Sequence, residues 1–335
     1  MPPPGEGGMS KVSADDRQYH VDGELVAASE ATVSVHDRGF AYGDAVFETI
    51  RVYGGVPFRW AAHAERLAES AAALSLPLPV ETAELRARVI ETLAANDLQE
   101  ATVKLSVTRG SDTRGLTPST EPEPTVVVTV SPLSRGGTAG ERVWDEPARL
   151  QTAKTRRVPD RALPSQAKTH NYLNQILARL ETRVSDATEA LVLDTNGYVA
   201  EAATANLWFV ADDALRTPSL EGPVLPGITR ETVLELARDE GIPVEEGRYE
   251  PDDVRAADEA FLTSSIREVK PIATVDGVAV GGGPVTTLVG RLYDARVDAA
   301  CYDENDDGSD SPREETDSGE TAPQEGTDES QPSGP

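Results

Sequence analysis

The feature of this sequence that most constrains its fold is the repeated placement of two-residue turn signals between apolar runs. These signals are Asp22-Gly23, Gly54-Gly55, Asn196-Gly197 and Asp276-Gly277. Asp-Gly, Asn-Gly and Gly-Gly pairs favour the tight turns that join antiparallel strands, because their residues tolerate positive φ. The chain is therefore expected to form β-hairpins in both its first and its second half.

Strand and helix patterns alternate around these turns. Strands are expected over 46–52, 102–108, 125–130, 189–194, 206–210 and 259–264. Helices are expected over 61–75, 81–95, 171–183 and 229–240, where apolar residues recur at helical spacing. In the third helix, one apolar face is formed by Tyr172, Leu173, Ile176, Leu177 and Leu180. The segment SRGGTAGE has the composition of a linker, so the chain is expected to consist of two α+β halves.

Both ends of the chain have compositions that disfavour folding. Residues 1–16 are rich in Pro and Gly and are expected to be disordered, with Met1 or Met9 as the true start. Residues 301–335 contain almost no apolar side chains and are expected to form a disordered acidic tail. The tail matches the spacing of a calcium-binding loop, but no amphipathic helices flank the match, so we interpret it as coincidence and predict no metal site. The matching residues are Asp303, Asn305, Asp307, Gly308 and Glu314.

The chain is strongly acidic. Its 335 residues carry a net charge of −27, from 58 Asp and Glu against 31 Lys and Arg. This excess disfavours nucleic acids and anionic membranes as partners. Together with few lysines and 5% aromatic residues, it favours a halophilic protein, in whose cytoplasm salt screens the self-repulsion. The alternative is an ordinary acidic protein with an acidic tail, but residues 301–335 carry −11 and residues 1–300 still carry −16.

Several classes of protein are disfavoured by what the sequence lacks. It has no apolar run of transmembrane length and no signal-peptide pattern, so a cytoplasmic location is expected. Its single cysteine, Cys301, excludes an internal disulfide and a cysteine-based zinc cluster. His20, His36 and His63 lack the spacing of metal ligands and are interpreted as structural.

Lysine is rare enough here that each one can be considered by itself. The five lysines are Lys11, Lys104, Lys154, Lys168 and Lys270. Lys168 lies between a loop and a helix with an apolar face, where its amine would be partly desolvated. Desolvation lowers the pKa of an amine and lets it attack a carbonyl group to form a Schiff base. The alternative is a structural or solvated lysine, which is the commoner role at the start of a helix.

A cofactor bound through a Schiff base, such as pyridoxal phosphate, requires more than an amine. Its phosphate requires N–H donors at a helix N-terminus, and its pyridine nitrogen requires a carboxylate. A Pro-Gly turn opens directly into a helix at Gly227, Ile228 and Thr229. Glu201 follows a strand among small residues, and Arg66 lies on a helix. Each of these features also has an ordinary interpretation. The turn at Gly227 could be a plain helix start, Glu201 an exposed glutamate at a strand end, and Arg66 a solvated arginine.

Six motifs, in order along the chain, resemble the fold-type IV pyridoxal-phosphate enzymes, also called class IV aminotransferases. The motifs are HDRGFAYGDAVFETIRV, HAERL, AKTHNYLNQILA, EALVLDTNGYVAEAATANLWF, LPGITRETVLELA and ADEAFLTSSIREVKPI. The resemblance runs from about Tyr19 to Arg296. The family contains branched-chain aminotransferases, D-amino acid transaminases and aminodeoxychorismate lyases.

This resemblance implies an α+β, two-domain fold of the D-amino acid aminotransferase type. Residues 17–133 would form a smaller N-terminal α/β domain, 134–141 the linker, and 142–300 a larger C-terminal cofactor-binding domain. The cofactor would lie in the cleft between the two domains. The family's members are at least homodimers with active sites near the subunit interface, so a homodimer acting on a small-molecule substrate is expected.

The resemblance also implies roles for single residues. Lys168 would bind pyridoxal 5'-phosphate covalently and shuttle protons, Glu201 would pair with the pyridine nitrogen, and Tyr172 would lie beside the ring. Gly227 would permit close approach of the phosphate. The groups that bind the phosphate would come from Arg66, Ile228, Thr229 and Ser265.

The loop at 104–118 indicates which of the family's reactions this chain catalyses. Its sequence, KLSVTRGSDTRGLTP, is similar to the K-x-x-x-x-R-G-S-x-x-R-G pattern of the lyases. By that similarity Lys104, Arg109 and Arg114 would bind a substrate with two carboxylates. The alternative for the two arginines is a basic loop that balances an acidic surface.

Three other residues are expected on the substrate side. Tyr42 and Phe47 are expected to line the pocket, although alternating aromatic residues could simply be core. Thr49 occupies a position where branched-chain aminotransferases usually carry glycine. Nothing in the resemblance assigns a role to His170.

These features favour an aminodeoxychorismate lyase, which converts 4-amino-4-deoxychorismate to 4-aminobenzoate, a folate precursor, and pyruvate. The alternative is a class IV aminotransferase that transfers an amino group from a branched-chain or other amino acid to 2-oxoglutarate. A third hypothesis is a non-catalytic acidic protein that retains the fold.

Overall fold

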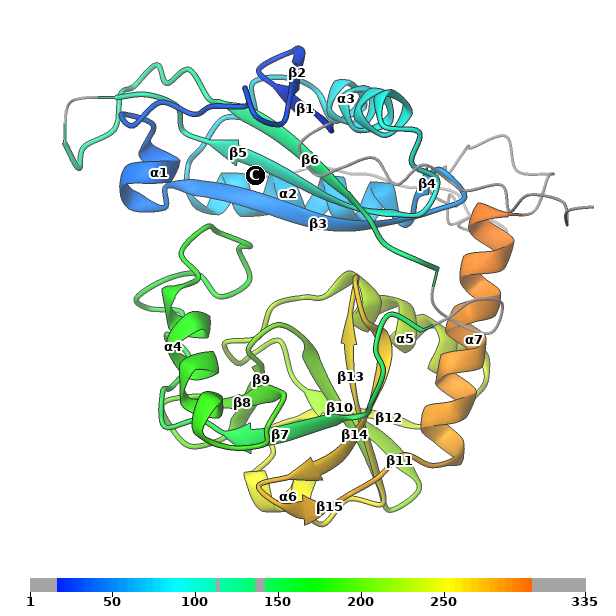
Figure 1. Ribbon diagram of the computed structural model, residues 1–335. Coiled ribbons are helices and arrows are strands. Elements are labelled where there is room, and N and C mark those ends of the chain that lie inside the picture. Colours follow the sequence, from blue (N-terminus) through cyan, green and yellow to red (C-terminus); the bar gives the residue numbers. More distant parts are fainter. Residues whose placement is uncertain (1–16, 113–114, 136–141, 303–335) are drawn as a thin grey trace, which may run out of the picture. The chain divides into compact units, whose positions relative to one another are not determined.

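The computed structural model describes residues 17–112, 115–135 and 142–302, which belong to one compact unit (Figure 1). Within these residues, six strands of the first half form one sheet. The strands are β1 (Gln18–Val21), β2 (Glu24–Ala27), β3 (Ala45–Tyr53), β4 (Val56–Pro57), β5 (Ala101–Thr108) and β6 (Val126–Pro132). They pair in the order β2-β1-β6-β5-β3-β4, and every one of these pairings is antiparallel.

The strands of the second half form a larger, mixed sheet. Its strands are β7 (Ala148–Thr152), β8 (Glu189–Leu193), β9 (Val199–Ala202), β10 (Asn206–Ala211), β11 (Ala214–Pro218), β12 (Val244–Gly247), β13 (Glu259–Ser264), β14 (Glu268–Val275) and β15 (Val278–Ala279). They follow the order β12-β11-β10-β13-β14-β7-β8-β9, with β15 paired to β14. β7 runs parallel to both β8 and β14, and β11 runs parallel to β12.

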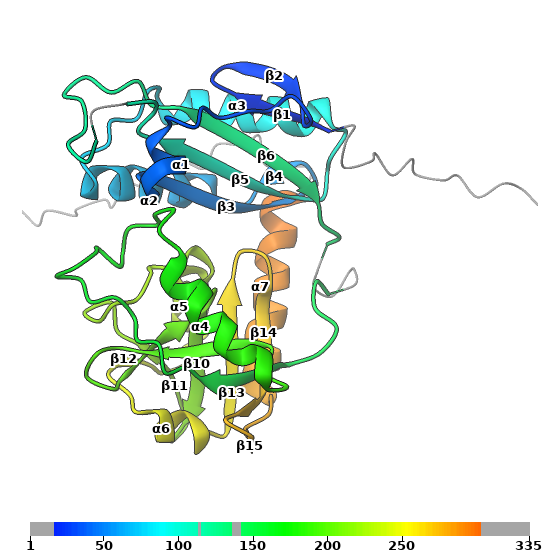
Figure 2. The ribbon, with the colours of Figure 1, turned by 60° about the vertical axis from the view of Figure 1, so that its left-hand side comes forward.

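The helices are distributed between the two halves. The first half has α1 (Arg38–Tyr42), α2 (Trp60–Ala73) and α3 (Thr82–Ala95). The second half has α4 (Leu173–Glu181), the 3₁₀ turn η2 (Thr182–Val184), α5 (Ile228–Asp239), α6 (Pro251–Arg255) and α7 (Pro284–Cys301). Figure 1 shows α7 along one side of the second sheet and α1 and α4 on the opposite side of the described unit, and Figure 2 shows α1 and α4 turned towards the viewer. No helix among the described residues is long and apolar enough to cross a membrane.

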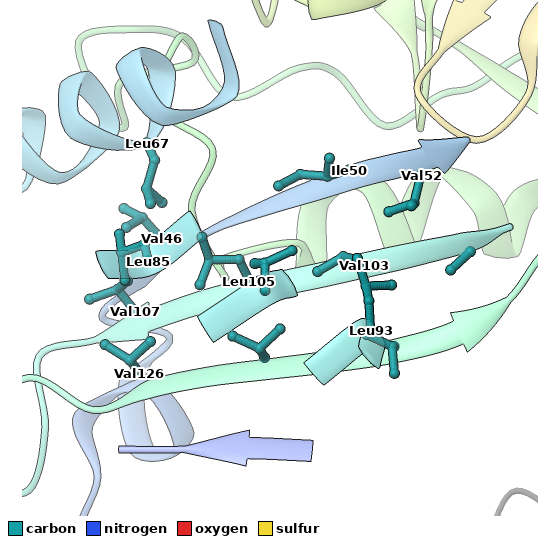
Figure 3. Close-up of a cluster of buried hydrophobic side chains, with 14 of the residues drawn as sticks. Val46, Ile50, Val52, Leu67, Leu85, Leu93, Val103, Leu105, Val107 and Val126 are labelled. Atoms are coloured by element: carbon teal, nitrogen blue, oxygen red, sulfur yellow. The ribbon is translucent and has the colours of Figure 1, made fainter. Parts of the chain in front are cut away.

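Strand β3 divides its side chains between two environments, because successive residues of a strand point to opposite faces. Val46, Ile50 and Val52 belong to a core that α2 and α3 cover through Leu67 and Leu85 (Figure 3). The same core takes alternate residues of the neighbouring strands β5 and β6. Phe47 and Thr49 on β3 point the other way, towards the second half of the chain. This alternation brings part of β3 to the wall of the cavity described below.

The two halves share a buried cluster. Tyr53 and Phe58 from the first half pack with Phe261 and Tyr293 from the second half. The ring centroids of Phe58 and Tyr293 are 5.8 Å apart in an edge-to-face arrangement. The hydroxyl of Tyr53 donates a hydrogen bond to the carboxylate of Glu268 at 2.8 Å. Burial of these aromatic rings therefore stabilises the contact between the halves as well as each half.

The predicted hairpin turns and regular elements are found close to their expected positions. The four turn signals join β1 to β2, β3 to β4, β8 to β9 and β14 to β15. The α+β fold with two sheets is confirmed. The predicted disorder of 1–16, most of the linker and nearly all of the acidic tail, including the calcium-loop match, lies outside the described residues.

The prediction for the helix at 171–183 differs from the structure. The α-helix occupies only 173–181, and a 3₁₀ turn follows it. Its buried residues are Gln175 and Ala178, whereas the predicted apolar face is exposed except for Tyr172, which is half-buried. Helical periodicity identifies a face that prefers to leave water, but it does not say which surface covers that face.

Candidate active site

A cavity of about 400 Å³ lies where β3 meets the loops of the second half. Its wall comes from four parts of the second half as well as from β3. These parts are the loop and helix start at 157–175, the turn at 201–206, the turn into α5 at 225–229, and the turn at 263–267. A volume of this size suits a small molecule rather than a polymer.

Lys168 is held in the cavity wall by its own backbone. Its N–H donates to Ser70 Oγ at 2.9 Å, and its carbonyl accepts from the N–H of Phe47 at 2.9 Å. The amine Nζ lies 3.1 Å from the hydroxyl of Tyr172 and 4.5 Å from the ring centroid of Phe47. Among the described residues, no carboxylate forms an ion pair with this amine. A hydroxyl and an aromatic ring therefore hold a primary amine at the cavity surface.

Glu201 supplies a buried carboxylate to the same cavity. It lies on β9 and is 7% exposed. Burial raises the pKa of Glu201, and the guanidinium of Arg157 opposes that rise. Arg157 Nε donates to the carboxylate at 2.8 Å, and the N–H of Leu225 donates at 3.0 Å. The sequence analysis did not single out Arg157, which lies eleven positions before Lys168 on the approach to the cavity.

The start of α5 faces the cavity. Gly227, Ile228 and Thr229 line the cavity, and no side chain caps the helix at Gly227. The first N–H groups of a helix carry partial positive charge and favour a phosphate. Arg66 and Ser265 line the same cavity, and Arg66 also donates to the carbonyl of Pro226 at 2.7 Å.

A buried pair of side chains orients Arg66. Glu48 accepts from Arg66 Nε at 2.9 Å and Nη2 at 2.5 Å, and it lies 2.7 Å from His63 Nδ1. Although burial acts to raise it, Arg66 and the His63 hydrogen bond lower the pKa of Glu48 to about 2. Burial lowers the pKa of His63, so its ring is neutral at neutral pH. Because a carboxylate only accepts, Nδ1 carries the hydrogen. No pattern in the sequence indicates this contact, which joins β3 to α2.

Gly227 is required by a close approach. A Cβ at this position would lie 2.0 Å from Asn206 Oδ1. The amide of Asn206 donates to the carbonyl of Leu225 at 2.9 Å, so it fixes the turn that leads into α5. Glycine therefore lets the chain pass Asn206 and aim its next N–H groups at the cavity.

The residues predicted for the substrate side are only partly brought together. Phe47 and Thr49 line the cavity. Lys104 does not line it, although its Nζ lies 4.8 Å from the ring centroid of Phe47. Tyr42 is exposed and lies outside the cavity wall. His170 hydrogen-bonds to Ser106 rather than reaching the cavity, and burial with nearby Lys104 lowers its pKa to about 4.

Arg109 does not take the position expected for a substrate ligand. It is 7% exposed and is not part of the cavity wall. Its Nε donates to Asp44 at 2.8 Å, and its other donors bind the carbonyls of Leu74 and Ser75 at 2.7 and 2.8 Å. A guanidinium with these partners is structural, because binding a substrate would require it to break them. Arg114, the second arginine of the loop, lies outside the described residues.

Comparison with known proteins assigns the chain to a family. Residues 45–275 match the family described as amino-transferase class IV. The chain belongs to the class IV aminotransferases. A putative branched-chain-amino-acid aminotransferase of Methanocaldococcus jannaschii is 35% identical over 275 residues, which are 82% of this chain and 93% of that protein.

Solved structures of class IV aminotransferase-family enzymes agree with the match. The branched-chain aminotransferase of Thermoproteus uzoniensis, solved with norvaline, superposes with a TM-score of 0.78 at 32% identity, covering 86% of this chain and 96% of that one. The 4-amino-4-deoxychorismate lyase of Pseudomonas aeruginosa gives a TM-score of 0.72 at 31% identity, covering 85% and 100%. Within the family, the predicted nearness to lyases is not supported over nearness to aminotransferases.

The cavity residues of this class IV aminotransferase fit pyridoxal 5'-phosphate, which is its cofactor. An amine, a buried carboxylate and an uncapped helix N-terminus surround one volume, and they match the aldehyde, pyridine nitrogen and phosphate of that molecule. When bound, the cofactor supplies a carbonyl group for an amine and a ring that accepts electrons. The chain is therefore a pyridoxal-phosphate-dependent enzyme.

Proposed function

We propose that this enzyme is an aminotransferase that moves the amino group of a branched-chain or other amino acid to 2-oxoglutarate. The observation that carries the proposal is the convergence of Lys168, Glu201 and the start of α5 on one cavity. Apolar side chains complete the wall and suit an aliphatic substrate side chain. They come from Phe47, Leu163, Pro164, Tyr172 and Ile266.

The roles of the protein groups follow from their contacts. Lys168 Nζ would act as the general base that takes the proton from the substrate α-carbon, and then as the general acid that gives it up on the cofactor side. The hydroxyl of Tyr172, 3.1 Å from Nζ, orients the amine for this transfer. Glu201, whose carboxylate accepts a hydrogen bond from Arg157, would hold the proton on the pyridine nitrogen. Arg66, Ser265 and the first N–H groups of α5 bind the phosphate and fix the position of the ring.

An aminodeoxychorismate lyase remains the second candidate. It is supported by the loop pattern at 104–118 and by the similarity to the lyase of Pseudomonas aeruginosa. Against it stands Arg109, one of the three cations predicted to bind a substrate with two carboxylates, because it binds Asp44 and two carbonyls instead. The aminotransferase is therefore the better-supported function.

Two experiments test this function. Purified protein should be yellow, and borohydride should abolish its absorbance band, whereas Lys168→Ala should lack the band. Leucine with 2-oxoglutarate should then yield glutamate, and aminodeoxychorismate should yield no 4-aminobenzoate. Production of 4-aminobenzoate without glutamate would favour the lyase, and a colourless protein that does not respond to added cofactor would contradict both. Assays belong in molar salt, because a chain this acidic could unfold in dilute buffer.

We further propose that the enzyme is a homodimer. The exposed apolar face of α4 is formed by Leu173, Ile176, Leu177 and Leu180. Other exposed apolar residues come from α1 and nearby loops, namely Val33, Val35, Phe40, Tyr42 and Leu116. Figures 1 and 2 show α1 and α4 on the same side of the described unit. An apolar surface of this extent, beside the cavity, supports contact with a second copy of the chain.

A further inference from the structure

The cavity wall holds one arginine that the proposed mechanism does not use. Arg267 lies in the turn between β13 and β14 and lines the same cavity as Lys168. Its side chain is 35% exposed, so it is partly open to solvent. The sequence analysis assigned it no role.

The guanidinium of Arg267 is incompletely paired. Its one carboxylate partner among the described residues is Glu189, at 3.6 Å, which is longer than a hydrogen bond. Glu189 is fully buried and is already bound by Arg179 Nη1 at 2.7 Å and by Thr204 Oγ1 at 2.7 Å. Because Glu189 has nearer partners, it positions Arg267 without saturating its donors.

The turn that carries Arg267 is fixed on both sides. The N–H of Arg267 donates to Ser264 Oγ at 3.2 Å. The next residue, Glu268, has a φ of 55° and is buried, with its carboxylate bound by the hydroxyl of Tyr53. A side chain on an anchored turn loses little conformational freedom when it binds a ligand.

The charges of the cavity differ from those of the chain. In the part of the wall that the structure describes, the charged side chains are Arg66, Arg157, Lys168, Arg267 and Glu201. Arg157 is matched by Glu201, and Arg66 is matched by Glu48 from behind the wall. A wall with this cationic excess, in a chain of net charge −27, attracts anionic substrates. After the cofactor phosphate is bound, Arg267 is the cation left for them.

We propose that Arg267 binds the second acidic group of substrates that carry two carboxylates, and so makes the enzyme prefer diacids to monoacids of equal length. A guanidinium forms paired, charge-assisted hydrogen bonds with a carboxylate, and the free donors of Arg267 allow this geometry. The inference rests on the proposed function, since it assumes that the first carboxylate and the amino group of the substrate lie beside Lys168.

The test compares two unreactive acids of the same length. Calorimetry of the holoenzyme measures the dissociation constants of glutarate, a diacid, and pentanoate, a monoacid, at one fixed salt concentration. Arg267→Ala should weaken glutarate binding about tenfold or more and leave pentanoate binding unchanged. Arg267→Lys should restore part of the lost glutarate affinity, because lysine restores the positive charge but not the paired N–H donors of the guanidinium. Arg86→Ala, at an exposed site on α3, is the matched control and should change neither.

Each other outcome overturns the inference. If the affinities for glutarate and pentanoate fall equally, Arg267 binds the carboxylate that the two acids share. If neither affinity changes, Arg267 does not contact the substrate. The absorbance band and unfolding midpoint of each variant should match the wild type, since Glu189 keeps Arg179 and Thr204. An enzyme that transfers amino groups without preferring diacids would refute only this inference. An enzyme that prefers diacids but transfers no amino group would refute only the proposed function.

Discussion

At the scale of single residues, the ionisation of Glu201 depends on Arg157. Burial raises the pKa of Glu201, and Arg157 opposes this from 2.8 Å. Arg157→Leu should raise that pKa further, so the carboxyl group becomes neutral and no longer holds the proton on the pyridine nitrogen. We expect the affinity for pyridoxal phosphate to fall about tenfold or more, measured by absorbance titration of the apoenzyme.

A neighbouring arginine provides the control for this change. Arg156 is exposed and bonds the carbonyl of Ala153 rather than the cavity. Arg156→Leu should bind the cofactor as the wild type does. Equal affinity in the Arg157→Leu variant would show that Glu201 ionises without help.

The buried contact between Glu48 and Arg66 predicts a loss of stability in acid. The folded-state pKa of Glu48 is about 2, against an ordinary value of 4.5, which corresponds to roughly 3 kcal/mol. Because the pKa is depressed, this stability is present above pH 4.5 and is progressively lost as the pH falls towards 2. Glu48→Gln should therefore lower the unfolding midpoint at neutral pH, and its difference from the wild type should shrink at pH values below 4.5.

This measurement requires two controls. His63, whose pKa is also lowered, destabilises the fold as the pH drops below 6.5, and Glu48 opposes part of that shift, so both proteins should also carry His63→Gln. Glu84→Gln removes an exposed ion pair with Arg88 on α3 and should shift the midpoint little at any pH. A difference between Glu48→Gln and wild type that stays constant down to pH 3 would contradict the depressed pKa.

The sequence could predict the residues of the cavity that lie in local motifs but not those that depend on distant contacts. Lys168, Glu201 and the turn at Gly227 stand in recognisable stretches, and the structure brings all three to one cavity. Arg157 meets its partner only because two segments 44 residues apart fold together. Arg109 shows the converse, since its motif suggested a substrate and its partners come from the distant Asp44 and the end of α2.

At the scale of elements, the turn into α5 has little room. The Cβ of Gly227→Ala would meet Asn206 Oδ1 at 2.0 Å and displace the amide that holds the carbonyl of Leu225. We expect the first N–H groups of α5 to move and cofactor affinity to fall about tenfold, with the fold retained. Absorbance titration measures the affinity and thermal unfolding measures the fold.

A second glycine provides the control for any general effect of a glycine-to-alanine substitution. Gly290 lies within α7, and a Cβ there would have open space. Gly290→Ala should leave cofactor affinity unchanged and raise the unfolding midpoint slightly, because alanine favours a helix. Unchanged affinity in Gly227→Ala would show that the turn tolerates the displacement.

The apolar face of α4 predicts the assembly of the enzyme. Leu177 is 46% exposed, and its neighbours on that face are exposed as well. Leu177→Asp places a charge where the second copy should pack, so the variant should be monomeric by light scattering. Leu288→Asp is the control, because Leu288 is 41% exposed on α7, which Figure 1 shows on the other side of the described unit from α4. A monomeric wild type, or a dimeric Leu177→Asp variant, would contradict the proposed interface.

Elements with strong local signals were predictable and those without them were not. The hairpins were marked by Asn-Gly, Asp-Gly and Gly-Gly pairs, and the helices α2, α3 and α5 by their apolar spacing. Helix α7 was not predicted, although it is the longest described helix and begins at Pro284, a favourable first position, because Gly290 lies within it and weakens its helical signal. Periodicity predicted α4 but not its exposure, which depends on a surface outside the chain's own core.

At the scale of the whole molecule, the acidic charge limits where the fold is stable. Residues 1–300 carry −16 and residues 301–335 carry −11, while the cavity wall is cationic. The chain therefore combines a surface that repels itself with a site that attracts anions. Salt weakens both effects, but exposed charges are screened far more strongly than buried or partly buried ones. Molar salt should consequently stabilise the fold more than it weakens substrate binding.

This balance gives the last prediction. The screening length falls from about 10 Å at 0.1 M salt to about 3 Å at 1 M, so the unfolding midpoint should rise steeply over that range of KCl and then level off. Sucrose at equal osmolality does not screen charge and should raise the midpoint less. Replacing the twelve acidic residues of 301–335 by their amides leaves the −16 of residues 1–300, so most of the salt dependence should persist. A midpoint that does not depend on KCl, or that follows sucrose equally, would show that self-repulsion does not limit this fold.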